Sequence, residues 1–450
     1  MDANGSVDYD LLVLDDRVHS RVYSDQQIFT DEMERVFHRG WVFVGHAGEI
    51  PEPGDYRLAW VGRYPIIMVR AADDEVRLLS NRCRHRANTV CQLERGNARF
   101  FRCDYHGWTY RNDGALASVS YPEGYDRSFD KADFGLIPLP RIASYRGFVF
   151  GSIAPHGMSL EAYLGHATAQ IDLFCDLSPL GEIDVRGGIH KYSYRGNWKL
   201  QIENSMDGYH PNFVHKSFFG MLGRKGIKTP TRHFGGSSIA VTRDFGHGHV
   251  MLDYRECNRT GQVLNVVQGG EQYRTAMEAR YGAARANDII TSGGTHLLVF
   301  PNLVMIGVQL RVIRPIAPDH TEVYLYPTLL KGVEPELNQW RLRGHESFFG
   351  PAGFGAPDDL EMFERMQVGF QNDLDPWLIL SRGMHRERRE ADGTRVGHVT
   401  DEVTQRGIWR EWRRVMTGRP DDLQNTDSET AQVRSAESSG ADTPPLLAAD

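Results

Sequence analysis

Residues 81–91 read N-R-C-R-H-R-A-N-T-V-C, and residues 101–108 read F-R-C-D-Y-H-G-W. Cys83 and His85 are two positions apart, Cys103 and His106 are three apart, and 17 residues separate the two pairs. Each pair can lie at the tip of one β-loop, so that the two loops face each other over a metal centre. The stretch predicts a small β domain with a site of two thiolates and two imidazoles.

Two kinds of metal centre use such a ligand set. One is a structural zinc ion, but zinc ribbons usually space their thiols as C-x-x-C. The order C-x-H and C-x-x-H is that of a Rieske 2Fe-2S cluster, in which two His replace two Cys on one iron. Gly107-Trp108 directly after His106 agrees with the cluster. We therefore expect a 2Fe-2S centre here, with Cys91 as a buried thiol outside it.

A second dense supply of metal ligands lies at residues 203–215, which read E-N-S-M-D-G-Y-H-P-N-F-V-H. On a continuous helix Glu203, Asp207 and His210 would share one face, whereas His215 would turn away. Pro211 lacks the N–H that a continuing helix uses, so the helix is expected to kink or end there and bring the second imidazole back. Two imidazoles and a carboxylate form the facial triad of non-haem Fe(II) sites. The alternative is a pair of ordinary histidines on an amphipathic helix.

Together, C-x-H-x17-C-x2-H-G-W and D-x-x-H-x-x-x-x-H resemble the large (α) subunit of Rieske non-haem iron aromatic-ring-hydroxylating oxygenases. The electron-transfer Rieske proteins of cytochrome complexes carry an extra cysteine in each loop. This chain has Ala87-Asn88 and Asp104-Tyr105 at those places. The resemblance covers most of the chain and implies an oxygenase component, not an electron carrier without mononuclear iron chemistry, which stays the alternative class.

The resemblance also implies roles for two aspartates. Asp359, near the start of a helix expected from Pro357 onwards, would be the third iron ligand with His210 and His215. For its neighbour Asp358 a simpler role is possible: the carboxylate can interact favourably with the positive end of the helix dipole. Asp207 would hydrogen-bond both His106 of one chain and His210 of the next in a trimer. A carboxylate in this place also fixes the tautomer of a ligating imidazole.

Dioxygen activation at one iron needs electrons delivered singly. By resemblance, the 2Fe-2S cluster would receive them from a ferredoxin or reductase that uses NAD(P)H and pass them to the mononuclear Fe(II). The motifs decide neither whether one or two oxygen atoms enter the product nor whether small β subunits join the homotrimer.

The fold class expected is α+β, with an all-β Rieske domain placed before a helix-grip catalytic domain, in which an antiparallel sheet wraps over helices. The expected boundaries are 1–39 for a helical arm that packs on the catalytic domain, 40–155 for the Rieske domain, 156–417 for the catalytic domain and 418–450 for a disordered tail. Within the catalytic domain we expect helices at Leu160–Leu177 and Asp401–Met416 and one strand at Val304–Ile313.

Composition narrows the function further. The chain has 450 residues, and its formal net charge of −8 gives no support to nucleic-acid binding, which calls for a basic patch. No apolar run approaches about 18 residues, and the first residues lack a basic region followed by an apolar one. We therefore expect a cytoplasmic protein that is not bound to a membrane. Five cysteines are too few and odd in number for a disulfide framework.

One arginine offers a hypothesis about the substrate. In the strand expected at Val304–Ile313, period-two alternation places Gln309 and Arg311 on one face. If that face borders the cavity, Arg311 can pair with an aromatic carboxylate; the alternative is an arginine that points to solvent or pairs with a structural acid. The resemblance adds Phe349 and Gly355 as pocket residues. A benzoate- or salicylate-type acid is therefore the expected substrate, with a neutral mono- or polycyclic arene as the alternative.

Overall fold

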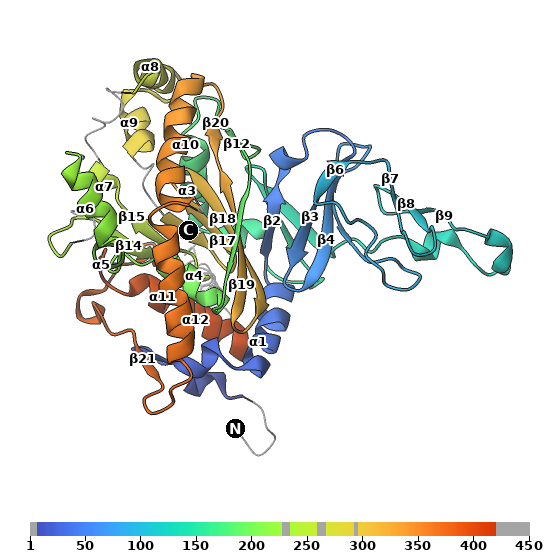
Figure 1. Ribbon diagram of the computed structural model, residues 1–450, viewed down its shortest axis with the longest axis horizontal. Coiled ribbons are helices and arrows are strands. Elements are labelled where there is room, and N and C mark those ends of the chain that lie inside the picture. Colours follow the sequence, from blue (N-terminus) through green and yellow to red (C-terminus); the bar gives the residue numbers. More distant parts are fainter. Residues whose placement is uncertain (1–6, 227–234, 259–266, 292–295, 351, 420–450) are drawn as a thin grey trace, which may run out of the picture.

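The computed structural model describes residues 7–226, 235–258, 267–291, 296–350 and 352–419, and it confirms the α+β class. A β-rich part, whose strands lie between residues 42 and 152, projects from a larger part built on a long antiparallel sheet (Figure 1). The tail expected at 418–450 lies almost wholly outside the described residues. Among the described helices, none has both the length and the apolar character needed to cross a membrane.

The β-rich part contains three small antiparallel sheets, with strand orders β10-β11-β2, β5-β4-β3-β6 and β7-β8-β9. Most of its strands follow the aromatic and β-branched runs of the sequence, and the central strand β4 buries four consecutive residues, Ile66, Ile67, Met68 and Val69. The bounds are β2 Val42–His46, β3 Asp55–Val61, β4 Tyr64–Arg70, β5 Val76–Ser80, β6 Arg95–Asn97, β7 Phe100–Arg102, β8 Thr109–Arg111, β9 Leu116–Ser118, β10 Arg141–Tyr145 and β11 Phe148–Ser152. β7, β8 and β9 lie towards the outer end of this part (Figure 1).

In the described residues, the larger part is organised by a sheet of order β13-β19-β18-β17-β16-β15-β14-β23-β22, antiparallel throughout. Its strands are β13 His190–Tyr194, β14 Val241–Asp244, β15 Val250–Asp253, β16 His296–Val299, β17 Leu303–Ile306, β18 Gln309–Ala317, β19 His320–Pro327, β22 Arg388–Arg389 and β23 Arg395–His398. Two short pairs accompany it, β12 Ile183–Asp184 with β20 Leu329–Leu330 and β1 Arg17–His19 with β21 Trp377–Ile379.

Helices cover this sheet, and α10 and α11 run across it in Figure 1. The helices are α1 Gln26–Glu32, α2 Leu160–Leu164, α3 Ala167–Cys175, α4 Trp198–Ser205, α5 Pro211–Val214, α6 Lys216–Arg224, α7 Arg255–Asn258, α8 Gly270–Tyr281, α9 Ala283–Thr291, α10 Pro335–Phe349, α11 Ala356–Gly369 and α12 Val403–Thr417. The arrangement of long helices over a curved antiparallel sheet is the one that the sequence predicted.

The N-terminal arm is fastened to the larger part by a buried carboxylate. Asp25 caps α1, and Glu32 at the end of α1 is fully buried. Glu32 accepts hydrogen bonds from Trp198 Nε1 at 2.9 Å, from Lys199 Nζ at 2.5 Å and from Trp412 Nε1 at 2.7 Å. The arm, α4 and α12 therefore meet at one ion pair.

Two elements differ from the sequence expectation, and glycine is the reason in both. The helix expected at Leu160–Leu177 is broken into α2 and α3 at Gly165, which has a φ of +47°. The strand expected at Val304–Ile313 is two strands, β17 and β18, that pair as a hairpin across Gly307, which has a φ of +46°. A positive φ suits glycine and ends regular structure.

Candidate metal centres and active site

The two Cys/His loops of the sequence come together in the β-rich part. Cys83 and Cys103 are buried at the base of the loops, whereas His85 and His106 are half-buried nearer the surface. The Nδ1 atoms of the two imidazoles lie 3.1 Å apart, and the rings meet edge to face. Two thiols on one side and two imidazoles on the other are the donor set of a Rieske cluster.

Both loops use the same local turn. The amide N–H of Ala87 donates to the carbonyl of Cys83 at 3.0 Å, and the amide N–H of Gly107 donates to the carbonyl of Cys103 at 2.9 Å. The closing residue has a positive φ in each case, +63° at Ala87 and +72° at Gly107. Trp108 stacks on the His85 ring with a centroid distance of 5.2 Å, which holds that imidazole in place.

The surroundings of the thiols fit thiolate ligands. The Tyr110 hydroxyl lies 3.3 Å from Cys83 Sγ, and the Asn88 amide donates to Cys103 Sγ at 3.7 Å. Burial raises the pKa of Cys103, but hydrogen bonds from backbone amides and from Asn88 outweigh it and leave that pKa below its usual value. Burial raises the pKa of Cys91, whose Sγ faces the carbonyl of Leu93. Cys91 is therefore a buried thiol beside the centre.

The second candidate centre is formed by His210, His215 and Asp359. One donor atom from each lies within 4.8 Å of the others, and Asp359 Oδ1 is 3.6 Å from Nε2 of His210 and 3.4 Å from Nε2 of His215. His215 and Asp359 are buried, and no lysine or arginine of the described residues pairs with the carboxylate. A buried anion between two imidazoles calls for a cation, so this site fits a mononuclear iron ion.

The chain reaches this geometry differently from the expected kink at Pro211. α4 already ends at Ser205, and α5 begins at Pro211 with His210 at its N-cap. Between them the chain turns closely under Val399, whose carbonyl would lie 2.4 Å from a Cβ at Gly208. Glu203 does not share the face of His210; it accepts a hydrogen bond from Tyr23 at 2.7 Å, away from the candidate iron ligands.

Asp207 lies beside the candidate iron site without entering the triad. Its Oδ2 is 3.1 Å from His210 Nδ1, and its Oδ1 accepts from the amide of Tyr209 at 2.6 Å. Burial lowers the pKa of His210, but the hydrogen bond and charge of Asp207 outweigh this and raise it. Because Nδ1 donates to Asp207, Nε2 keeps its lone pair for a metal.

Asn204 is a site residue that the sequence did not single out. Its amide donates to Asp359 Oδ1 at 3.2 Å and lies 3.3 Å from His210 Nε2. Asparagine is common near helix ends, so the residue type did not mark Asn204 as part of a site. Asp358, in contrast, lies 3.7 Å from His215 Nδ1, on the ring edge opposite the triad.

A cavity of about 320 Å³ opens next to the triad. Its walls are apolar and aromatic to a large extent, and Phe348 meets the His215 ring edge to face at 4.9 Å. His296 also borders it; burial lowers the pKa of this imidazole to about 4, so it is neutral at pH 7. Phe218, Arg311 and Phe349 also line it.

Arg311 is the one buried cation on this wall among the described residues. Its side chain is buried, Nη1 donates to Ser205 Oγ at 2.9 Å, and Nε has no hydrogen-bond partner within the part of the chain that the structure describes. The guanidinium lies 5.6 Å from the Phe349 ring centre, and no carboxylate of the described residues forms an ion pair with it. Arg311 therefore points neither to solvent nor to a structural acid.

Only one of the other three residues expected at the pocket lines the cavity. Phe349 lines the cavity. Gly355 does not, but a Cβ there would lie 2.5 Å from the Phe348 ring, so the glycine makes room for a wall residue. Gln309 is fully buried outside the cavity wall.

Comparisons with known proteins follow the same division of the chain. Residues 40–130 match the family model described as Rieske [2Fe-2S] domain, and residues 182–418 match that described as ring hydroxylating alpha subunit (catalytic domain). The chain is 36% identical over 384 residues to the 2-halobenzoate 1,2-dioxygenase large subunit of Burkholderia cepacia, covering 82% of this chain and 80% of that one. It is also 36% identical over 390 residues to the anthranilate 1,2-dioxygenase large subunit of Acinetobacter baylyi, covering 82% and 81%.

Among solved structures, the chain is similar to naphthalene 1,2-dioxygenase with indole bound in the active site. The TM-score is 0.78 at 27% identity, and the match covers 91% of this chain and 95% of the other. The similarity therefore spans both metal-binding parts.

Proposed function

The chain belongs to the large (alpha) subunits of Rieske aromatic-ring-hydroxylating oxygenases, and from this premise we propose that it dihydroxylates the ring of a benzoate-type acid. Enzymes of this family are oxidoreductases that incorporate O2. An electron carrier without mononuclear iron chemistry has no need of the buried group of His210, His215 and Asp359 beside a cavity.

The observation that carries the proposal is the buried guanidinium of Arg311 in the cavity wall. A buried charge without a partner of opposite sign is costly, and a ligand carboxylate would relieve that cost. A planar guanidinium can hold a carboxylate by two parallel hydrogen bonds. Because Nη1 is bonded to Ser205, the carboxylate would be held by donors of the guanidinium that this bond leaves free.

The names of similar proteins agree with an acid. Halobenzoate and anthranilate are aromatic carboxylates, and the two large subunits named for them are 36% identical to this chain. The structure named for naphthalene, a neutral arene, is similar at 27% identity. Neutral mono- and polycyclic arenes are the second candidate, because most of the cavity wall is apolar.

Each cavity residue then has a task. When bound, the mononuclear iron supplies dioxygen activation and the 2Fe-2S cluster supplies electrons. Arg311 orients the acid by its carboxylate, and Phe349 packs against the guanidinium at 5.6 Å. The aromatic walls at Phe218 and Phe348 exclude water from the ring. Asn204 donates to Asp359 and so holds the orientation of that carboxylate.

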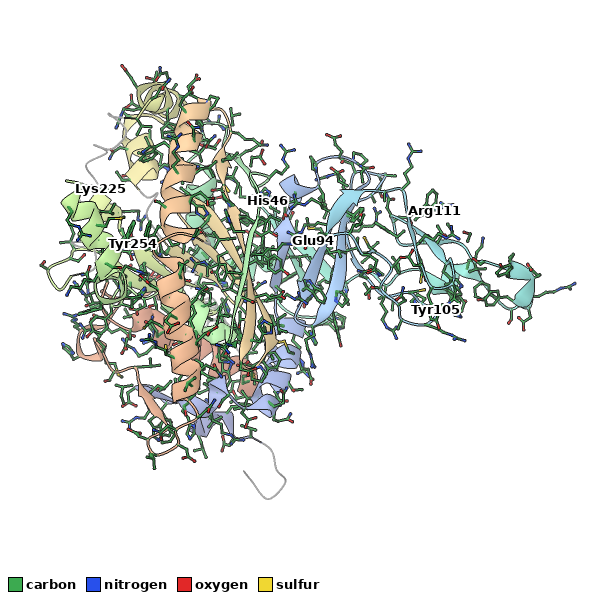
Figure 2. The ribbon with its side chains drawn as sticks, viewed as in Figure 1. His46, Glu94, Tyr105, Arg111, Lys225 and Tyr254 are labelled. Carbon is green, nitrogen blue, oxygen red and sulfur yellow. The ribbon has the colours of Figure 1, made fainter. Side chains whose placement is uncertain are left out.

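We also infer electron transfer between subunits of a homotrimer. Tyr105, the neighbour of His106, lies on the projecting β-rich part, whereas Tyr254, which borders the cavity, lies on the far side of the larger part (Figure 2). Such a separation within one chain favours transfer from His106 of the partner subunit through Asp207, which is partly exposed. A ferredoxin or reductase that oxidises NAD(P)H would supply the cluster, and small β subunits would complete the assembly, as in multi-component systems.

Product analysis with ¹⁸O₂ tests the proposal. The purified oxygenase, supplied with a surrogate reductase, should convert benzoate or a 2-substituted benzoate to a cis-diol acid with two ¹⁸O atoms. Naphthalene and biphenyl serve as neutral competitors. Faster turnover of the neutral arenes would contradict the acid, and one labelled atom would contradict dioxygenation.

A further inference from the structure

A second group of metal-ligating side chains lies outside the active site. His190 at the start of the edge strand β13 meets His345 and Glu346 near the end of α10, and one donor atom from each lies within 4.8 Å of the others. His190 Nε2 is 2.7 Å from Glu346 Oε1, and the two imidazole rings are 5.9 Å apart. None of the three borders the substrate cavity.

His345 makes this group unusual. The side chain is 1% exposed, and neither Nδ1 nor Nε2 has a hydrogen-bond partner within the described residues. A buried polar atom without a partner is rare in folded proteins and costs stability. Burial lowers the pKa of His345 to about 4, helped by the nearby charges of His190 and Arg311. The imidazole is therefore neutral at pH 7, the form in which it binds a metal.

We propose that His190, His345 and Glu346 form a binding site for a divalent transition-metal ion of the zinc type. Two imidazole nitrogens and one carboxylate oxygen are a common zinc ligand set. Ligand atoms about 2.0–2.1 Å from a tetrahedral zinc ion lie about 3.3 Å from one another. The 2.7 Å contact between His190 and Glu346 would thus open by roughly 0.6 Å, which the exposed Glu346 side chain can accommodate.

The metal would join the edge of the sheet to α10. The last turn of this helix carries Phe348 and Phe349, which line the substrate cavity, and the Phe349 ring is 6.0 Å from that of His345. The ion would therefore fix the cavity wall from behind without touching the substrate. The ion would stabilise the fold and take no part in the reaction, and its site is separate from the triad at His210.

Zinc titration of the iron-replete oxygenase tests the site. The holoenzyme is equilibrated with ZnCl2 at micromolar free concentration, and zinc and iron per chain are measured by elemental analysis after gel filtration. We expect one zinc per chain with no loss of iron. His190→Gln and Glu346→Gln, at exposed or half-buried positions that folding tolerates, should each weaken zinc binding at least about 100-fold.

Glu336→Gln is the matched control, because Glu336 is an exposed acid in the first turn of the same helix. It should bind zinc as the wild type does, and zinc should raise Tm in both. Equal zinc content in the two site variants and the wild type would overturn the proposal. Zinc uptake matched by iron loss would assign the ion to the triad, and uptake only at millimolar zinc would mark an adventitious ion; either result also overturns it.

Discussion

Asp207 Oδ2 lies 3.1 Å from Nδ1 of His210, while Nε2 of the same imidazole faces Asp359 Oδ1 at 3.6 Å. One ring therefore connects a partly exposed carboxylate with the candidate iron site. The carboxylate fixes which nitrogen is free for the metal, and its partial exposure is what the proposed contact with a neighbouring subunit requires.

Asp207→Ala should leave both metal centres largely loaded and cut turnover at least about 100-fold, since the ligands remain but the link to them is lost. Iron analysis and the cluster spectrum check the loading, and single-turnover oxidation of the cluster checks the link. Glu361→Gln, an exposed acid on α11, is the control. Cluster oxidation at the wild-type rate in Asp207→Ala would refute the bridging role.

Cys103→Ala or His106→Ala should each abolish the visible absorbance of the cluster, because each removes a direct ligand. Cys91→Ala should keep the full spectrum, since its thiol faces the carbonyl of Leu93 instead. Absorption and electron paramagnetic resonance spectra of the reduced proteins make the comparison. A colourless Cys91→Ala protein would show that the ligand assignment is wrong.

Arg311→Leu should raise the Michaelis constant for a benzoate-type acid by about 10- to 150-fold, the equivalent of about 1.5–3 kcal/mol for a charge-assisted hydrogen bond. Cluster reduction should stay at the wild-type rate. Arg314→Leu is the matched control: it lies on the same strand, but its guanidinium faces Trp60 and Glu322 outside the active-site cavity. An unchanged Michaelis constant in Arg311→Leu would exclude the carboxylate clamp.

Glu32→Gln should destabilise the larger part by about 3–5 kcal/mol, because it leaves the buried Lys199 ammonium without its counter-ion. The double variant Glu32→Gln with Lys199→Met should recover much of this loss. Calorimetric Tm values of the three proteins measure the effect. Glu34→Gln, an exposed acid in the same arm, should leave Tm unchanged.

Glu203 should make stability depend on pH. Burial raises the pKa of this carboxyl to about 7, above its usual value of 4.5. The fold thus favours the protonated form, so the contribution to stability is full below about pH 4.5 and is lost as pH rises through 7. Relative to wild type, Glu203→Gln should gain on the order of 2 kcal/mol between pH 5 and pH 8. A difference between the two proteins that does not change with pH would contradict this.

The sequence predicted which side chains come together at the two candidate centres better than it predicted the path of the chain between them. The two Cys/His pairs, and the pair His210 and His215, each have a characteristic spacing within a short stretch of sequence. The local pattern was therefore sufficient to find them. Asp359 lies far downstream, and an aspartate near a helix start has a simpler explanation in the helix dipole. Only the family resemblance singled it out, and the structure then placed it 3.4 Å from His215.

What the sequence missed depends on tertiary packing. α4 ends at Ser205, and at Gly208 the chain passes close to Val399, a contact between residues that no local pattern links. The hairpin at Gly307 was predicted as one strand because polar and apolar residues alternate on the C-terminal side of the glycine as they do in a strand. Nor does a local pattern show that His249 is buried, with its imidazole bonded to the backbone of Tyr163 and Phe300.

The ion pair of Glu32 with Lys199, closed by Trp412, has a consequence for biosynthesis. During translation the arm emerges before the β-rich part, and α12 emerges much later. Glu32 can therefore bond to Trp412 only when nearly all described residues have emerged. The core around the two Cys/His loops, formed by residues between Tyr56 and Leu136, needs no such delay. Cluster insertion can therefore precede closure of the iron-binding part during translation.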